Sequence, residues 1–172
     1  VDRGWIHPAV SWSFDGTKLV YSKYHFGKHQ SFGLDIRLVD IETGKGVWLT
    51  HSFRAAHPHW SPVEVLIVFV AHKNSSSNLY TIKPDGTDLN KLTDYSDDTQ
   101  IVSPAWSPDG SMIAFSEAGP DGNMDIMVLE TATNTISRLT DFPDVDYLPV
   151  WHPDGKKMSF TQKNEFVDFA KA

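Results

Sequence analysis

Histidine and arginine side chains gather in one stretch of the sequence, "HSFRAAHPHWSP", residues 51–62. His57 and His59 are two residues apart, so on a β-strand both side chains would point to the same side. Two imidazoles and a third from a neighbouring loop could bind a divalent transition metal, with Arg54 nearby to hold an acidic group. The alternative is that these are ordinary polar loop and channel residues. We favour this alternative, and predict no cofactor, because surface histidines without a close-spaced ligand set are common.

Two further groups of polar residues are candidates for a binding surface. The segment 23–33, "KYHFGKHQSFG", contains His25 and His29 with two lysines and three aromatic residues, a composition typical of a recognition loop. A solvated insert of variable length explains it equally well. Acidic residues form the second group, for which we favour a role in solvation and turns over a weak calcium site; they are Asp94, Asp97 and Asp98, then Asp141, Asp144 and Asp146.

These side chains are embedded in an internal repeat. Four of the six tryptophans begin related pentapeptides, with steps of 48, 46 and 45 residues: "WSFDG" at Trp12, "WSPVE" at Trp60, "WSPDG" at Trp106 and "WHPDG" at Trp151. A period of this length indicates a stacked or radial architecture. One large aromatic side chain per repeat predicts that these four tryptophans are structural and pack between neighbouring repeats.

A second pair of markers keeps a fixed distance within each copy. "DIRLVD" begins at Asp35, "NLYTIK" at Asn78 and "DIMVLE" at Asp125, and a Leu-Thr pair follows each of them after 14 residues. Length differences therefore fall between the second and third segments of a copy, where a loop would absorb them.

Each complete copy resolves into four short extended segments. The first ends at the tryptophan, a Pro-Asp-Gly type turn follows in the clearest copies, and the second segment is apolar, as in "LIVFV" from Leu66. No segment shows a helical apolar period. Four strands in about 45 residues are typical of a propeller blade. We predict an all-β fold: a β-propeller segment of about three and a half four-stranded blades, at about 8–50, 57–93, 104–140 and, as a half blade, 149–162, with a tail of unknown structure at 163–172.

The third copy carries a family resemblance. "PAWSPDG" from Pro104, "IAFS" from Ile113, "DGN" from Asp121 and "RLT" from Arg138 resemble the TolB-like propeller repeat, and weaker copies extend the resemblance over nearly the whole chain. The second copy departs from it at Val63-Glu64, where Asp-Gly is expected, so its turn must differ. The resemblance implies a propeller, a periplasmic or exported location, and cell-envelope proteins or a disordered peptide as partners.

Propeller geometry separates the loops into two faces. Loops that join strands two and three, or one blade to the next, share one face, which we call the second face. Seven of the eight histidines map to this face or to the strand that enters from it. The predicted binding residues on this face are His25, His29, His51, Arg54, His57, His59, His72, Asp94, Asp97, Asp141 and Asp144.

Charge and composition exclude several classes of partner. The formal net charge is −7 and the isoelectric point is about 5.5, so we expect neither nucleic acid nor an anionic membrane surface as a partner. No stretch is long and apolar enough to predict a membrane span. The absence of an initiating Met and of a signal peptide predicts a mature or trimmed product.

We expect a non-catalytic module that binds a protein or peptide. The alternative is a metal-assisted lyase or hydrolase acting on acidic carbohydrate through His57, His59 and Arg54, to which a distant resemblance to propeller-type oligogalacturonide lyases adds support. Since closed propellers have about 4–8 blades, three and a half blades further predict either a homodimer or the remainder of a longer propeller.

Overall fold

The computed structural model describes residues 6–26, 32–119 and 122–163. In this part of the chain all regular structure is β, in three four-stranded antiparallel sheets and one two-stranded sheet, which confirms the predicted fold class. His29 and the tail residues 164–172 lie outside the described residues.

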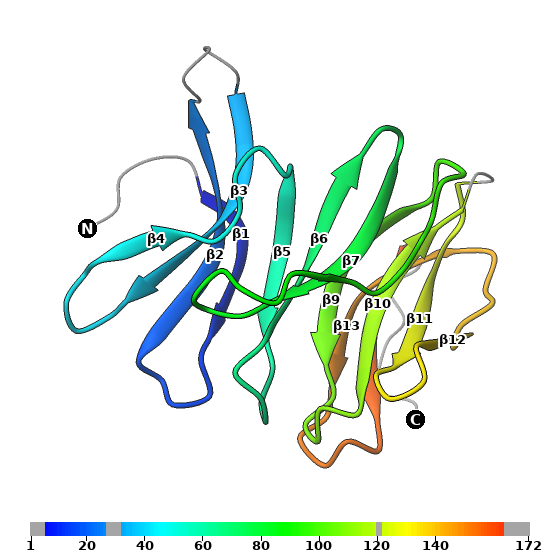
Figure 1. Ribbon diagram of the computed structural model, residues 1–172. Coiled ribbons are helices and arrows are strands. Elements are labelled where there is room, and N and C mark those ends of the chain that lie inside the picture. The colour runs from blue at the N-terminus through cyan, green and yellow to red at the C-terminus, as the bar shows by residue number, and fades with distance from the viewer. Residues whose placement is uncertain (1–5, 27–31, 120–121, 164–172) are drawn as a thin grey trace.

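The four sheets follow one another along the chain as blades, each in sequential strand order (Figure 1). Blade one contains β1 (Ile6–Trp12), β2 (Lys18–Phe26), β3 (Phe32–Asp40) and β4 (Gly46–Trp48). Blade two contains β5 (Ala55–Trp60), β6 (Ile67–Lys73), β7 (Ser76–Ile82) and β8 (Asn90–Lys91). Blade three contains β9 (Gln100–Trp106), β10 (Met112–Ala118), β11 (Met124–Glu130) and β12 (Thr135–Arg138), and blade four contains β13 (Val145–Trp151) and β14 (Met158–Lys163).

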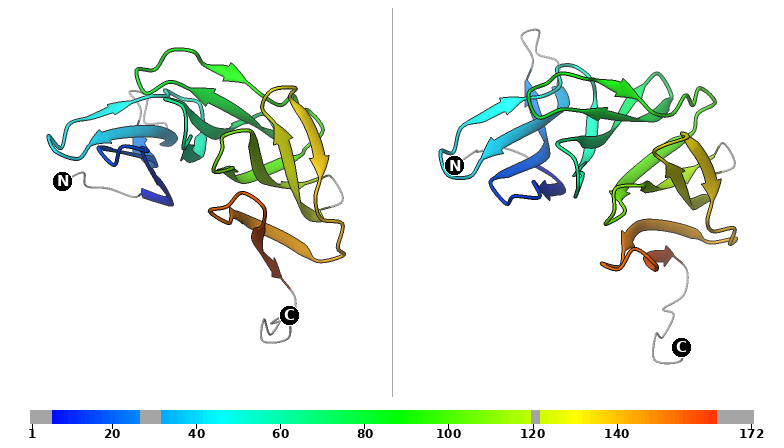
Figure 2. Two further views of the ribbon diagram at one scale, coloured as in Figure 1. Left: turned by 90° about the horizontal axis from the view of Figure 1, so that it is seen from below. Right: turned by 60° about the horizontal axis from the view of Figure 1, so that its bottom comes forward.

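The blades are arranged in an open arc, with blade one at one end and blade four at the other (Figure 2). The first strands of the four blades, β1, β5, β9 and β13, lie on the inner side of this arc, and each contacts the next. We call them the inner strands. This order brings residues that are about 45 positions apart in the sequence into contact.

The hydrophobic core consists of layers between blades. The apolar side chains of β6 contribute to the core layers on both sides of blade two, because successive side chains of a strand point to opposite faces. Ile67, Phe69 and Ala71 belong to the layer shared with blade one, whereas Val68 and Val70 belong to the layer shared with blade three. A central strand covered on both faces needs apolar residues at every position, which explains why the second segments read as continuous hydrophobic runs.

The repeated tryptophans lie against the preceding blade. Trp60 and Trp106 are 5% and 7% exposed, in the layers between blades one and two and between blades two and three. Trp12 is 55% exposed, because no blade precedes blade one in the described structure.

The constant 14-residue spacing has a hydrogen-bonding cause. In each complete blade the threonine of the Leu-Thr pair, Thr50, Thr93 or Thr140, accepts from the amide 14 residues earlier, at 2.9 Å in all three cases. The same hydroxyl donates to the side chain that begins the third segment, with Oγ1–O distances of 2.8 Å to Asp35, 2.9 Å to Asn78 and 3.5 Å to Asp125. The same pair of bonds thus recurs at the same spacing in all three complete blades.

The Asp-Gly turns are built by local hydrogen bonds. The Asp109 carboxylate accepts from the Ser107 hydroxyl at 2.7 Å and from the Ser111 amide at 3.1 Å, and these bonds lower its pKa to about 2. Gly110 has φ of +72°, and a Cβ there would lie 2.3 Å from Cγ2 of Val63. Blade two differs, as its sequence predicts, because the Ser61 hydroxyl instead accepts from the Glu64 amide.

Trp106→Ala should lower the free energy of unfolding by about 3–5 kcal/mol, the usual cost of removing a buried aromatic side chain. Trp12→Ala is the matched control: it removes the same side chain at the same repeat position, but from an exposed surface, and should cost about 1 kcal/mol or less. Urea melts of the two variants and the wild type measure both values. Equal losses would contradict the assignment of Trp106 to a buried layer between blades.

Thr93→Val should destabilise the fold by about 1–3 kcal/mol, because it leaves the buried Leu79 amide and the Asn78 side chain without the hydroxyl that joins them. Thr133→Val is the control, since Thr133 is exposed and its hydroxyl bonds only a nearby Glu130 carboxylate and the Thr135 amide. Thermal melts compare the two, and an unchanged Thr93→Val variant would refute a structural role for the repeated threonine.

Candidate functional site: the pocket between the inner strands

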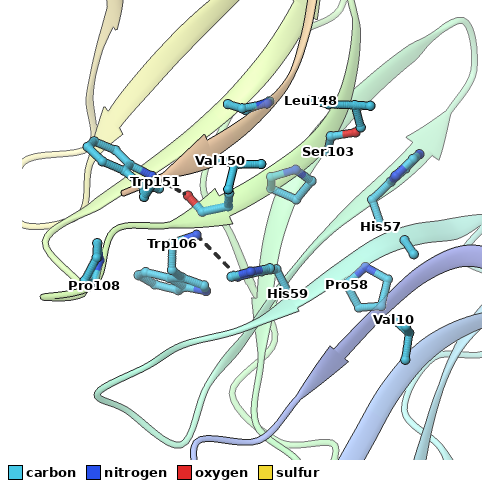
Figure 3. A pocket seen from close by; sticks show the side chains of 14 residues that line it. Val10, His57, Pro58, His59, Ser103, Trp106, Pro108, Leu148, Val150 and Trp151 are labelled. Atoms are coloured by element: carbon cyan, nitrogen blue, oxygen red, sulfur yellow. Dashed lines mark hydrogen bonds between the residues drawn. The ribbon is translucent and has the colours of Figure 1, made fainter. Parts of the chain in front are cut away.

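The inner strands enclose a pocket with a volume of about 540 Å³ (Figure 3). All four blades contribute to it, so its shape depends on how the blades pack. Its lining residues are Ala9, Val10, His57, Pro58, His59, Ser103, Pro104, Ala105, Trp106, Pro108, Leu148, Pro149, Val150 and Trp151. We call this the channel pocket.

A repeated bulge shapes the wall of the channel pocket. His57, Ser103 and Leu148 each lie three residues before a repeated tryptophan and have φ of 52°, 55° and 57°. The register of the inner strand against its neighbour shifts beside each of them. A proline follows in all three cases. This fits a bulge, because proline has no backbone N–H to donate to the neighbouring strand. The bulge bends the strand and redirects its side chains.

The chemistry of the channel pocket is apolar with a few neutral polar groups. No Asp, Glu, Lys or Arg is among the lining residues in the described part of the chain. Four prolines and two tryptophans supply rigid apolar surface, and Ser103 and the two histidines supply hydrogen-bonding groups. Such a surface suits an uncharged or apolar ligand segment, because a charged group would enter without a counter-charge.

His59 has a structural contact within this wall. Its Nδ1 accepts a hydrogen bond from the Trp106 amide at 3.3 Å, so the neutral ring carries its proton on Nε2. Burial lowers the pKa of His59 to about 4, since a charged imidazole would lose its hydration there. His59 is therefore a neutral link between blades two and three.

His57 and His59 do not form the pair that the sequence predicted. Strict alternation would place both side chains on one side of β5, but the bulge at His57 interrupts it. In Figure 3 the ring of His59 points toward Trp106, while that of His57 points away from it. Within residues 6–26, 32–119 and 122–163, no three His, Cys, Asp or Glu side chains are grouped so that they could hold a metal ion.

Arg54 also lies apart from the two pocket histidines. The Arg54 carbonyl accepts from the His72 amide at 3.3 Å. Burial of His72 lowers the pKa of its imidazole, and the positive charge of Arg54 lowers it further. Neither Arg54 nor His72 lines the channel pocket, and His51 is exposed outside it. The predicted stretch 51–62 is thus divided between two places.

His25 belongs to a separate polar cluster in blade one. Its Nε2 lies 2.8 Å from Oδ2 of the fully buried Asp35, and its ring centroid lies 4.7 Å from that of Trp48. Asp35 also accepts from the Ser52 and Phe53 amides at 2.8 and 3.0 Å. This cluster anchors the loop after β4 to β3.

The predicted acidic residues are dispersed over local contacts. Asp94 pairs with Lys91 and Asp97 accepts from the Thr99 hydroxyl, and in each carboxyl these contacts lower the pKa. Asp141 pairs with Arg138, which also binds Asp125 at 2.6 Å. Asp144 is half-buried.

Sequence reasoning missed most of the channel pocket. Ser103, Leu148 and Val150 line it, although none of them has a side chain that suggests chemistry. The available signal was the proline two residues before the tryptophan in three copies, because proline inside a strand marks a bulge or an edge.

Comparisons with known proteins agree on the architecture. No protein-family model matches the chain. A Tol-Pal system protein TolB from Alcanivorax borkumensis is 29% identical over 96 residues, which are 55% of this chain and 22% of that protein. A solved structure of a putative TolB from Agrobacterium tumefaciens superposes with a TM-score of 0.75 at 21% identity, covering 95% of this chain and 60% of that one. The chain is similar to TolB in sequence and has its β-propeller fold.

The TolB-like fold is shared with an enzyme. An oligogalacturonate lyase in complex with manganese superposes with a TM-score of 0.71 at 19% identity, covering 92% of this chain and 47% of the lyase chain. At this identity the likeness concerns the fold alone, so function has to be argued from the site. In the described part of the TolB-like chain, no helix has the length and apolar character needed to cross a membrane.

Acid should weaken the TolB-like fold through His59. Its pKa is about 4 when folded, against an ordinary value of 6.5, so the unfolded chain binds the proton more readily. The contribution of His59 is complete above pH 6.5 and is lost as the pH falls from 6.5 to 4, by at most about 3 kcal/mol. Urea melts across this range measure it.

His59→Asn is the control, because the amide oxygen can accept from Trp106 but does not titrate. The difference in unfolding free energy between wild type and variant should fall with decreasing pH only between 6.5 and 4. A difference that stays constant over this range would show that His59 is not buried as a neutral ring.

Proposed function

We propose that this TolB-like chain is a non-catalytic module of the cell envelope that binds a protein or peptide in its channel pocket, at a periplasmic or exported location. The observation that carries the proposal is that, among the residues the structure describes, no Asp, Glu, Lys or Arg lines this pocket of about 540 Å³. Prolines and tryptophans favour apolar side chains, and neutral polar groups favour peptide amides.

The similarity to TolB supports a partner from the cell envelope. The curated relatives are named Tol-Pal system proteins, which makes Pal the first protein to test. Their matched regions amount to 22% and 16% of their own lengths, so the partner of this chain is proposed and not transferred.

The alternative, a metal-assisted reaction on acidic carbohydrate, has less support. An acidic sugar needs a cationic group, and Arg54 is outside the channel pocket. His59 points its Nδ1 at the Trp106 amide, which leaves that nitrogen occupied. Arg54 is thus not assembled with His57 and His59 in the channel pocket.

Purified Pal, titrated into the chain in a calorimeter, tests the proposal. We expect binding by the wild type and at least about tenfold weaker binding by His57→Asp, because its carboxylate enters a pocket without a counter-charge. Aspartate tolerates the positive φ at this position.

His51→Asp is the matched control, with the same change on an exposed residue outside the channel pocket, and should bind like the wild type. Circular dichroism checks that both variants are folded. No binding by the wild type would refute Pal as the partner, and equal binding by both variants would refute the channel pocket as its site.

A further inference from the structure

Arg54 and His72 form a pair of basic residues at the second face of blade two. Arg54 directly precedes β5 and His72 is near the end of β6, so these antiparallel strands bring the two residues to the same end of the blade (Figure 1). The Arg54 carbonyl accepts from the His72 amide at 3.3 Å, which fixes the two backbones side by side. The Arg54 side chain is exposed and that of His72 is half-buried, so a ligand can reach the pair from solvent.

The loop that carries Arg54 is held in a defined conformation. Arg54 has φ of 50°, in the left-handed region that residues with a Cβ rarely adopt. Just before it, the Ser52 and Phe53 amides donate to the buried Asp35 carboxylate. Backbone outliers of this kind gather at binding sites, where the surrounding contacts hold them in place. The direction in which the Arg54 side chain leaves the backbone is therefore set before any ligand arrives.

No carboxylate pairs with these two side chains in the described part of the chain. Lys83, Lys91 and Arg138 each form an ion pair with an aspartate. In contrast, no ion pair between described residues includes Arg54 or His72. Basic side chains without an acidic neighbour are available to an anionic ligand, because binding does not have to break an existing pair.

The charges that act on His72 agree with this. Burial lowers the pKa of its imidazole most, and the Arg54 charge lowers it further. The contact that raises this pKa comes from the neutral side chain of Gln100 and not from a carboxylate. Asp97, an acid of the same face, acts instead on blade three, where it adds to the effect of burial in raising the pKa of Glu117. The pair thus keeps its positive charge in a chain whose net charge is −7.

We propose that Arg54 and His72 bind a carboxylate group of an acidic peptide segment. A guanidinium presents two parallel N–H donors that match the two oxygens of a carboxylate. An anion beside the imidazole favours its charged form, which donates from both ring nitrogens. The chain as a whole repels an acidic ligand, so this pair would direct such a ligand to one place.

The position of the site favours a peptide over a small anion. Arg54 lies three residues before His57, so the site is about 10 Å or less from the channel pocket along the inner strand of blade two. A peptide whose apolar segment occupies the channel pocket would thus bring an acidic residue about three positions away to Arg54. This choice of ligand rests on the proposed function, whereas the anion site itself does not.

Titration with tetraglutamate, followed by the NMR signals of the histidine rings, tests the site without Pal. At neutral pH and low salt, tetraglutamate should shift the signal of His72, which is assigned by its loss in His72→Gln. Tetraglutamine has the same length without the charge and should leave the signal in place. His152, which pairs with Asp154 in blade four, is the internal reference and should not shift.

Arg54→Gln should weaken the binding of tetraglutamate by about tenfold or more, the effect of losing a charge-assisted pair of hydrogen bonds. Lys156→Gln is the matched control, because it removes one positive charge from an exposed residue between β13 and β14; it should bind tetraglutamate like the wild type. Circular dichroism checks that the variants are folded, as expected for changes at exposed positions.

The absence of a His72 shift with tetraglutamate, an equal shift with tetraglutamine, or equal weakening by Arg54→Gln and Lys156→Gln would each overturn the proposal. A shift with trigalacturonate but not with tetraglutamate would also overturn it, in favour of an acidic carbohydrate. Failure of Pal to bind the wild type would refute Pal as the partner but would leave the tetraglutamate titration unchanged, so the two failures are distinguishable.

Discussion

The fold depends on the contact between a tryptophan and the inner strand of the blade before it. A single four-stranded blade has apolar residues on both faces and cannot bury either alone, so each blade needs a neighbour on each side. The tryptophan supplies the apolar area of this contact, and a hydrogen bond to the residue before the previous tryptophan fixes its register. Blade two has a neighbour on both sides, and its strand β6 is accordingly buried at five consecutive positions.

Much of this architecture could be predicted from the sequence, because its determinants repeat. The spacing of the tryptophans gave the blades, and the fixed distance of 14 residues reflects the threonine that bonds both the amide and the side chain of the third strand. The side chain that bonds this threonine is an aspartate in blades one and three and an asparagine in blade two, and each has its own local partner. Asp35 has His25, Asp125 has Arg138, and the neutral Asn78 binds the amide and carbonyl of Tyr95.

The candidate site could not be predicted to the same extent, because it depends on a departure from regular strand geometry. His57 and His59 look like a pair only if β5 alternates strictly, and the positive φ at His57 breaks that alternation. Nothing in a single copy reveals the bulge. Proline at the same position in three copies indicates it, but the repeat must first be aligned. Chemical reactivity is also a poor guide here, since the channel pocket is lined mainly by proline, alanine, valine and tryptophan.

The channel pocket and the contacts between blades share residues in this molecule. His59 and Trp106 both line the channel pocket and form the link between blades two and three, while Ala105 and Trp151 do the same between blades three and four. A ligand that presses on these side chains therefore acts directly on the angle between blades. Under the proposed function, a ligand that leaves these contacts in place would add apolar contacts along an existing wall and would not need a charged group to turn toward it. Ion pairs such as Lys91–Asp94 and Arg138–Asp141 lie instead at the second face, and none of these four residues lines the channel pocket.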